Sequence, residues 1–280
     1  MRVLIAGCGW LGRSVGATIA ARGARVWGVR RTSAAAVELE RAGISPLVLD
    51  LARRDEAERL PDVDAVVACP APAGSGVAAY RETYVAAIGG LLARYPARDL
   101  PFVYTSSTGV FARTDGAWVD ERTPVDPATA TAAVLVEAER QVLDAGGRVL
   151  RLSGLYGPQR YGILERVRTG RLSVGAGEQR FMNLCHREDA TRAVTAALER
   201  GSAGATYHAS DAEPVRRGDL VRWIAARLGI EPHASEVDAG GPDRRIDAAW
   251  SRAVLGTELA FPTFREGLAE PLGPAAAERL

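Results

Sequence analysis

The chain of 280 residues has the composition of an ordinary globular protein, with 47% hydrophobic and 25% charged residues. This length is enough for one large domain or two interlocked ones. The 35 basic and 34 acidic residues leave a formal net charge of only +1. This balance argues against a nucleic-acid or membrane-surface binder, because those partners attract a strongly basic protein.

The cysteines and the apolar runs give expectations about metals, membranes and compartment. Cys8, Cys69 and Cys185 are scattered and lack Cys-x-x-Cys spacing, so neither a disulfide framework nor a metal site is expected. The apolar run at residues 3–6 is too short for a signal-peptide core, and no stretch approaches membrane-spanning length. We therefore expect a cytoplasmic protein whose thiols are buried.

Lysine is absent from the chain, so every basic side chain is an arginine. This absence excludes chemistry that needs a lysine amine: a Schiff base, the lysine of a P-loop, and any catalytic pair of tyrosine and lysine.

In chain order, short β-rich runs alternate with longer helical patterns through the first half of the sequence. Strands are predicted at residues 2–6, 25–29, 45–49, 65–68, 101–104 and 148–152, and helices at 11–22, 34–42, 77–94 and 130–144. Such alternation predicts an α/β fold with a parallel sheet. The spacing favours a doubly wound sheet, although the strand pattern alone does not exclude a closed barrel.

The alternation weakens after about Gly154, where Gly/Pro-rich turns interrupt shorter elements. Helices are predicted at 187–198 and 217–228, the second ending at Gly229 as a C-cap glycine. We expect a first domain at 1–155 and a smaller C-terminal substrate-binding lobe at 156–280, interleaved with the first.

The first loop has the glycine spacing of a dinucleotide-binding fold. Gly7, Gly9 and Gly12 form a G-x-G-x-x-G pattern, with Trp10 and Leu11 inside it, between a hydrophobic strand and an amphipathic helix. In a Rossmann domain the first glycine permits the tight turn, the second lets a pyrophosphate approach, and the third lets the helix pack on the strand. This loop favours the doubly wound Rossmann fold over the barrel. The alternative is a Gly-rich turn without a ligand.

The end of the second strand favours NADP(H), although NAD remains possible. An NAD-specific site normally offers an acidic residue to the ribose 2′-OH, but Arg30, Arg31 and Thr32 stand here. Guanidinium and hydroxyl groups suit a 2′-phosphate. The alternative is a solvated basic turn. Asp50, which ends the third strand, is either an adenine contact or an exposed turn residue.

The segment 104–111, Tyr-Thr-Ser-Ser-Thr-Gly-Val-Phe, follows an apolar strand where an open α/β sheet binds its ligands. Together with Gly7–Gly12 it resembles the extended short-chain dehydrogenase/reductases (the NAD-dependent epimerase/dehydratase type). The segments 150–158, 183–189 and 207–214 extend the resemblance over nearly the whole chain. It implies a catalytic hydroxyl on Ser107, with Thr108 beside it. The alternative is that Ser106 and Ser107 satisfy backbone groups at the strand end.

The chain departs from this family where a Tyr-x-x-x-Lys pair is expected. The two positions fall on Thr131 and Leu135, which cannot perform the family's proton transfer, so the chain resembles an atypical member. Tyr156 and His186 lie on segments that the family places near the nicotinamide and are candidate proton donors. The alternatives are a packing role for Tyr156 and, for His186, a hydrogen bond with the Asp189 helix cap.

The sequence therefore predicts an NAD(P)-binding oxidoreductase or epimerase/dehydratase-like enzyme that acts on a small hydroxyl- or carbonyl-bearing metabolite, with NADP(H) favoured. The alternative is a catalytically silent NADP(H)-binding redox sensor or partner-binding protein. A homodimer is possible, because dimers formed through a helix pair are common in the family, but the sequence identifies no interface.

Overall fold

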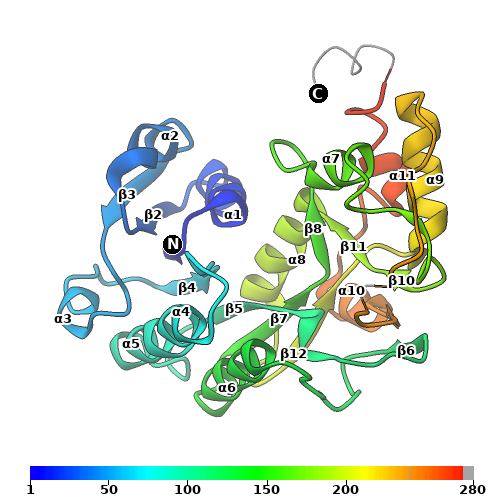
Figure 1. Ribbon diagram of the computed structural model, residues 1–280. Coiled ribbons are helices and arrows are strands. Elements are labelled where there is room, and N and C mark those ends of the chain that lie inside the picture. Colours follow the sequence, from blue (N-terminus) through cyan, green and yellow to red (C-terminus); the bar gives the residue numbers. More distant parts are fainter. Residues whose placement is uncertain (239, 274–280) are drawn as a thin grey trace.

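The computed structural model describes residues 1–238 and 240–273, and within them seven parallel strands form one sheet (Figure 1). The strand order is β12-β7-β5-β4-β1-β2-β3. The chain reverses its direction of progress between β1 and β4, so the predicted doubly wound sheet is confirmed and the barrel is excluded. The strands are β1 (Arg2–Ala6), β2 (Arg25–Arg30), β3 (Ile44–Val48), β4 (Ala65–Ala68), β5 (Phe102–Ser107), β7 (Arg148–Leu152) and β12 (Thr206–Ala209).

Both faces of the sheet are covered by helices because its central strands are apolar on both sides. Along β1, Val3 and Ile5 pack with α1 (Trp10–Ala21) and α8 (Arg187–Arg200) on one face. Leu4 and Ala6 point to the other face, with α5 (Ala87–Arg94) and α6 (Ala130–Asp144). The remaining helices of the first half are η1 (Ser33–Ala35), α2 (Ala36–Arg41), α3 (Arg54–Ala57), α4 (Val77–Tyr80), the π-helical η2 (Arg81–Ala86) and η3 (Thr108–Val110).

Two differences from the predicted boundaries shape the site. The helix predicted at 77–94 is α4, η2 and α5 in succession, so a π-helical segment lies in its middle. The strand predicted at 101–104 continues to Ser107, because Thr105, Ser106 and Ser107 pair with Leu150, Arg151 and Leu152 of β7.

The second half of the chain contributes to the sheet and also forms a separate core. It supplies the edge strand β12 and the covering helix α8, while Leu164, Leu220 and Phe264 pack together in a cluster outside the sheet. Helix α9 (Arg217–Leu228) is followed by Gly229 with φ 67°, which confirms the predicted C-cap glycine. The division at residue 155 stays a prediction. The other elements are β6 (Ala117–Val119), β8 (Gly154–Tyr156), α7 (Gly162–Arg168), β9 (Val174–Gly175), β10 (Phe181–Met182), β11 (Leu184–His186), β13 (Val215–Arg216), α9 (Arg217–Leu228), β14 (Ala234–Ser235), β15 (Arg244–Ile246), α10 (Ala249–Leu255) and α11 (Phe264–Gly267).

The cysteines, the potential metal ligands and the helix lengths bear on the expectations about thiols, metals and membranes. Cys8, Cys69 and Cys185 are buried free thiols. No group of three or more His, Cys, Asp or Glu side chains among these residues is arranged to hold a metal ion. None of the described helices combines the length and apolarity needed to cross a bilayer.

Candidate functional site

A cavity of about 1270 Å³ lies at the carboxyl ends of six strands of the sheet. Its walls include the residues that end or follow β1, β2, β3, β4, β5 and β7, which is where an open α/β sheet binds ligands. His186 is not among the lining residues. The predicted site residues that line the cavity are Gly7, Gly9, Trp10, Leu11, Gly12, Arg30, Arg31, Thr32, Asp50, Ser107, Thr108 and Tyr156.

The three glycines of the loop differ in what a Cβ at each position would contact. Gly7 has φ 81°, and a Cβ there would overlap the Cys69 carbonyl. A Cβ on Gly12 would lie 2.6 Å from the Gly7 oxygen and 3.0 Å from Ile5 Cγ2. A Cβ on Gly9 would meet nothing nearer than Arg30 Nη1, at 3.7 Å. Folding therefore requires glycine at positions 7 and 12, whereas at Gly9 the open space suits a ligand.

The N-terminus of α1 offers donors to such a ligand. The first-turn residues Trp10, Leu11 and Gly12 line the cavity, and in the part of the chain that the structure describes no side chain caps this helix. Uncapped first-turn N–H groups and the positive end of the helix dipole are the usual partners of a pyrophosphate. The residues present therefore fit a dinucleotide.

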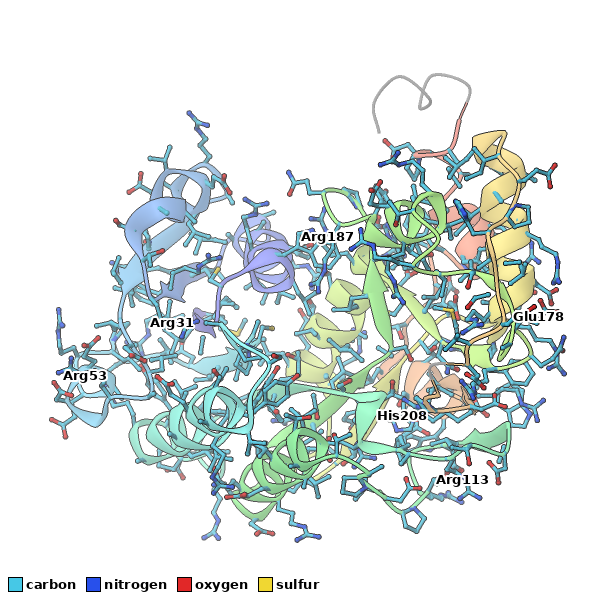
Figure 2. The ribbon with its side chains drawn as sticks, in the orientation of Figure 1. Arg31, Arg53, Arg113, Glu178, Arg187 and His208 are labelled. Atoms are coloured by element: carbon cyan, nitrogen blue, oxygen red, sulfur yellow. The ribbon has the colours of Figure 1, made fainter. Side chains whose placement is uncertain are left out.

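Trp10 connects the phosphate loop to the second half of the chain. Its Nε1 donates a hydrogen bond to the Pro158 carbonyl at 2.8 Å. The guanidinium carbons of Arg160 and Arg187 lie 5.3 and 5.0 Å from the centre of its ring, within cation–π range. Arg187 begins α8 (Figure 2).

The basic turn after β2 lies beside the phosphate loop. Arg30 Nη1 donates to the Cys8 carbonyl at 3.2 Å, which holds this half-buried guanidinium next to Gly9. Arg31 is exposed, and within the described ranges neither arginine forms an ion pair with a carboxylate. Both guanidinium groups thus have donors to spare. Asp50 Oδ1 accepts the Ala52 N–H at 3.1 Å and closes the turn after β3.

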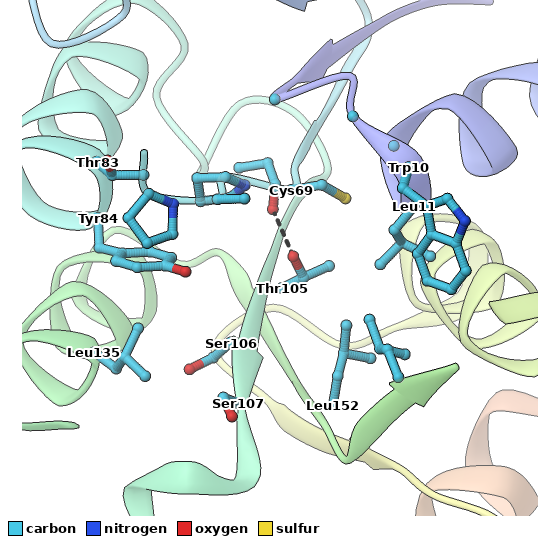
Figure 3. Close-up of a pocket in the computed structure, with 18 of the residues that line it drawn as sticks. Trp10, Leu11, Cys69, Thr83, Tyr84, Thr105, Ser106, Ser107, Leu135 and Leu152 are labelled. Atoms are coloured by element: carbon cyan, nitrogen blue, oxygen red, sulfur yellow. Dashed lines mark hydrogen bonds between the residues drawn. The ribbon is translucent and has the colours of Figure 1, made fainter. Parts of the chain in front are cut away.

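The hydroxyls at the end of β5, of which Figure 3 shows those of Ser106 and Ser107, differ in their hydrogen bonds. Ser107 Oγ accepts the Gly109 N–H at 3.0 Å, so it caps the following turn but still carries a proton to donate. Thr108 Oγ1 donates to the Leu152 carbonyl at 3.4 Å. Ser106 Oγ is buried and has no hydrogen-bond partner among the described residues. Sequence reasoning treated Ser106 only as a backbone partner and missed it as a candidate.

Tyr84, in the π-helical η2, is a second residue that sequence reasoning missed. It is half-buried, it lines the cavity, and Figure 3 shows its hydroxyl turned toward β5. Leu135, at the position that the resemblance assigned to the family's lysine, lines the same cavity. Burial and the neighbouring Tyr80 raise the pKa of Tyr84 to about 12, so this phenol is protonated at neutral pH. A single tyrosine within a predicted helix gives no sequence signal for such a position.

The structure does not bring the side-chain polar groups of Tyr156 and His186 to these hydroxyls. The Tyr156 hydroxyl is buried against Gly267 of α11, in the space that a Cβ there would need, and burial raises its pKa. His186 Nδ1 accepts the Glu188 N–H at 3.3 Å and so caps α8. Burial lowers the pKa of His186 to about 4. Asp189, the partner suggested for His186, instead accepts backbone N–H groups of residues 260 and 261.

Arg244 is the third residue missed from the sequence. It enters the cavity wall from β15, and its Nη2 donates to the Thr108 carbonyl at 2.8 Å. A segment far away in the sequence therefore places this guanidinium at Thr108, the residue that directly follows β5.

Comparisons with known proteins agree with this arrangement. The family model described as the NAD dependent epimerase/dehydratase family matches residues 3–210. The protein YeeZ of Escherichia coli K12 is 30% identical over 276 residues, which cover 93% of this chain and 96% of YeeZ. A protein of Stigmatella aurantiaca, named 4-hydroxy-2-methyl-3-oxo-4-farnesyl-3,4-dihydroquinoline-1-oxide ketoreductase, is 27% identical, with 92% of this chain and 80% of that protein covered.

A solved structure gives the same result in three dimensions. A putative NAD-dependent epimerase/dehydratase from Methylobacillus flagellatus superposes with a TM-score of 0.80 at 26% identity, covering 100% of this chain and 99% of that one. The expected resemblance is thus confirmed over the sheet, the phosphate loop and the second half of the chain. The chain belongs to the NAD-dependent epimerase/dehydratase family.

Proposed function

We propose that the protein is an NADP(H)-dependent oxidoreductase that reduces the carbonyl group of a small metabolite. The observation that carries this proposal is a single cavity lined both by the open Gly7–Gly12 loop and by the hydroxyl-bearing residues Ser106, Ser107 and Tyr84. The ketoreductase name of the Stigmatella relative agrees with this reaction type.

The turn after β2 supports NADP(H) over NAD(H). Arg30 offers guanidinium donors beside Gly9, while Arg31 and Thr32 add a second guanidinium and a hydroxyl to the lining of the same cavity. A 2′-phosphate is bound well by such groups, whereas the ribose 2′-OH of NAD(H) would want a carboxylate. When bound with its nicotinamide toward β5, NADPH would supply the hydride.

The hydroxyls at the end of β5 hold the substrate oxygen, and the Tyr84 phenol protonates it. Ser107 accepts the Gly109 N–H and donates its own proton to no group among the described residues, and the unpartnered Ser106 is available to donate as well. Both polarise the carbonyl oxygen. Tyr84 then donates its proton to that oxygen as the carbonyl carbon receives hydride, which completes the alcohol. Tyr156 and His186 receive no role, because their polar groups are engaged or buried elsewhere.

The high pKa of Tyr84 favours reduction over epimerisation or dehydration. A phenol with a pKa of about 12 readily protonates an alkoxide, which is more basic still. An epimerase or dehydratase must first remove a hydroxyl proton, and a phenol with so high a pKa is a poor base at neutral pH. The absence of lysine leaves no ammonium group to lower this pKa.

The test is NADPH oxidation, followed by absorbance, with a panel of small aldehydes and ketones. We expect turnover with at least one of them and a large loss of kcat in Ser107→Ala, with the Kd of NADPH unchanged. A Ser107→Ala variant that retains full activity would remove this serine from the mechanism.

The missing lysine also favours a second candidate, a cofactor-binding redox sensor without turnover. This alternative predicts tight NADPH binding together with no reduction of any carbonyl in the panel. Turnover that depends on Ser107 would exclude it.

A further inference from the structure

Two arginines are buried near the hydroxyls of β5, and they differ in how their charge is satisfied. Arg151, 6% exposed, donates to the Glu139 carboxylate through Nη2 at 2.7 Å and Nε at 3.1 Å. Its guanidinium also lies 5.1 Å from the centre of the Phe111 ring. Arg151 therefore has a counter-ion within the protein and an aromatic face beneath it, as expected for a structural buried charge.

Arg244, 7% exposed, has no such counter-ion in the described part of the chain. The one hydrogen bond that its guanidinium makes there is to the Thr108 carbonyl, and its Nε is buried without a partner. The charge of Asp126 raises the pKa of Arg244, but burial lowers it by more. A guanidinium has five N–H donors and stays charged in proteins, so most of its binding capacity is unused.

The backbone around Arg244 holds it firmly in this position. β15 pairs with β6, with Arg244 opposite Ala117. On its other side the Asn183 amide donates to the Arg244 carbonyl at 2.9 Å and accepts the Ile246 N–H at 2.7 Å. A buried cation fixed on a paired strand is preorganised for a ligand, which reduces the entropy lost on binding.

The cavity itself is more basic than the chain as a whole. The arginines that line it are Arg30, Arg31, Arg160, Arg166 and Arg244, whereas its acidic lining residues are Asp50 and Glu82. The whole chain has a formal net charge of only +1. The cavity lining therefore carries an excess of basic groups, and Arg244 is the one held beside Thr108.

We infer that Arg244 binds an oxyanion of the substrate, so that the substrate is a small carbonyl compound that also bears a carboxylate or a phosphate. A planar guanidinium matches the two oxygens of either group. The anion would lie next to the hydroxyls that receive the carbonyl oxygen, since Thr108 follows Ser107 directly. This inference rests on the proposed reductase function for the identity of the reacting group, but not for the anion site.

The first experiment compares matched substrates with the intact protein and saturating NADPH. Acetoacetate is compared with methyl acetoacetate, and hydroxyacetone phosphate with hydroxyacetone. We expect the charged member of one pair to have a kcat/KM about 10- to 100-fold above its neutral partner, the range of one charge-assisted hydrogen bond. A preference in the acetoacetate pair would identify a carboxylate site, and a preference in the hydroxyacetone pair would identify a phosphate site. Equal values in both pairs would overturn the inference.

The second experiment assigns the preference to Arg244. Arg244→Gln should abolish it while the Kd of NADPH stays unchanged, and Arg244→Lys should retain part of it. The matched control is Arg245→Gln, since Arg245 is outside the cavity lining, donates to the Gly116 carbonyl and stacks on Trp118. A preference that survives in Arg244→Gln, or is lost equally in Arg245→Gln, would contradict the assignment.

A third measurement needs no turnover. Acetate and inorganic phosphate are titrated into the protein, and the thermal midpoint Tm is recorded for the natural chain, Arg244→Gln and Arg31→Ala. A rise in Tm that is lost in Arg244→Gln and kept in Arg31→Ala supports the anion site even if no carbonyl is reduced, in which case the proposed reductase function fails alone. Reduction of neutral ketones without any such rise would leave the function standing and overturn the anion site.

Discussion

The two ends of the cavity differ in what satisfies their polar groups. At the phosphate-loop end the groups are uncapped N–H groups of α1 and the guanidinium groups of Arg30 and Arg31, of which Arg31 is exposed to water. At the β5 end, Ser106 and Arg244 are buried; among the described residues the Ser106 hydroxyl has no hydrogen-bond partner and the Arg244 guanidinium is only partly satisfied. A ligand at the first end replaces water, whereas at the second end it completes hydrogen bonds that the fold leaves unmade. Substitutions should therefore affect binding at the first end and turnover at the second.

The largest effect should come from the β5 end. Tyr84→Phe removes the proposed proton donor and keeps the ring, so kcat should fall by about 100- to 10,000-fold while the Kd of NADPH is unchanged. Steady-state kinetics and fluorescence titration check the two quantities. Tyr80→Phe is the matched control, because this neighbouring ring, 5.3 Å from that of Tyr84, is not a lining residue. Equal losses in both variants would indicate a packing effect.

The two buried arginines give a second contrast, in stability. Glu139→Gln leaves the Arg151 charge without its counter-ion, and it should lower the free energy of unfolding by about 3–5 kcal/mol. Arg244→Met removes a charge that has no counter-ion to lose, so the free energy of unfolding should change by less than about 1 kcal/mol or rise. Urea unfolding measures both variants. A larger loss of unfolding free energy in Arg244→Met would mean that this arginine stabilises the fold. It would then count as a structural residue, like Arg151, and not as one held for a ligand.

Asp211, a buried acid outside the cavity, shows how much an unpartnered polar group lowers the free energy of unfolding. Neither carboxylate oxygen of Asp211 has a hydrogen-bond partner among the described residues, and burial and Glu213 raise its pKa to about 8. Between pH 4 and 8 the folded chain holds this proton and the unfolded chain releases it. This group therefore makes stability fall as pH rises through that window, by about 1.4 kcal/mol per pH unit, and its contribution levels off above pH 8.

Asp211→Asn should remove this fall in stability between pH 4 and 8. Compared with the natural chain, the variant should be clearly more stable at pH 8 and differ much less at pH 5, as measured by urea unfolding at both values. The exposed Asp219→Asn is the control. Parallel pH profiles for the natural chain and Asp211→Asn would show that Asp211 ionises normally in the fold.

The smallest effect is expected at the phosphate-loop end. Arg31→Ala should raise the Kd of NADPH by about 10- to 100-fold, because one charge-assisted contact to the 2′-phosphate is lost, and should leave the Kd of NADH unchanged. Tryptophan fluorescence follows both titrations. Arg53→Ala serves as the control, since Arg53 is exposed and pairs with Asp55. A similar loss for NADH would refute the 2′-phosphate assignment.

The phosphate-loop end could be predicted from the sequence because its determinants are local. Glycine spacing, the preceding apolar strand and the basic turn at 30–32 lie within one unit of strand, helix and strand, so their positions in space follow from their positions in the chain. The same locality explains why the helix at 130–144 and the strand at 148–152 have the bounds that the pattern predicts.

The β5 end could not be predicted in the same way, because it is assembled from distant segments. Tyr84 reaches the cavity from a π-helical segment that no periodicity signals. Arg244 meets Thr108 across 136 positions of sequence, so no local pattern connects the two residues. Likewise β12, which the sequence pattern left unassigned, becomes an edge strand only through its pairing with β7.

The Trp10 indole connects the two ends of the cavity, so it can couple the binding of the cofactor to the binding of the substrate. It lines the cavity beside the phosphate loop and is hydrogen-bonded to Pro158, close to residues that line the cavity from the second half of the chain. A cofactor that shifts Trp10 must also strain or strengthen this bond, and with it the turn at 157–160. Thermodynamic linkage then requires reciprocity: whatever factor the cofactor imposes on substrate affinity, the substrate imposes on cofactor affinity.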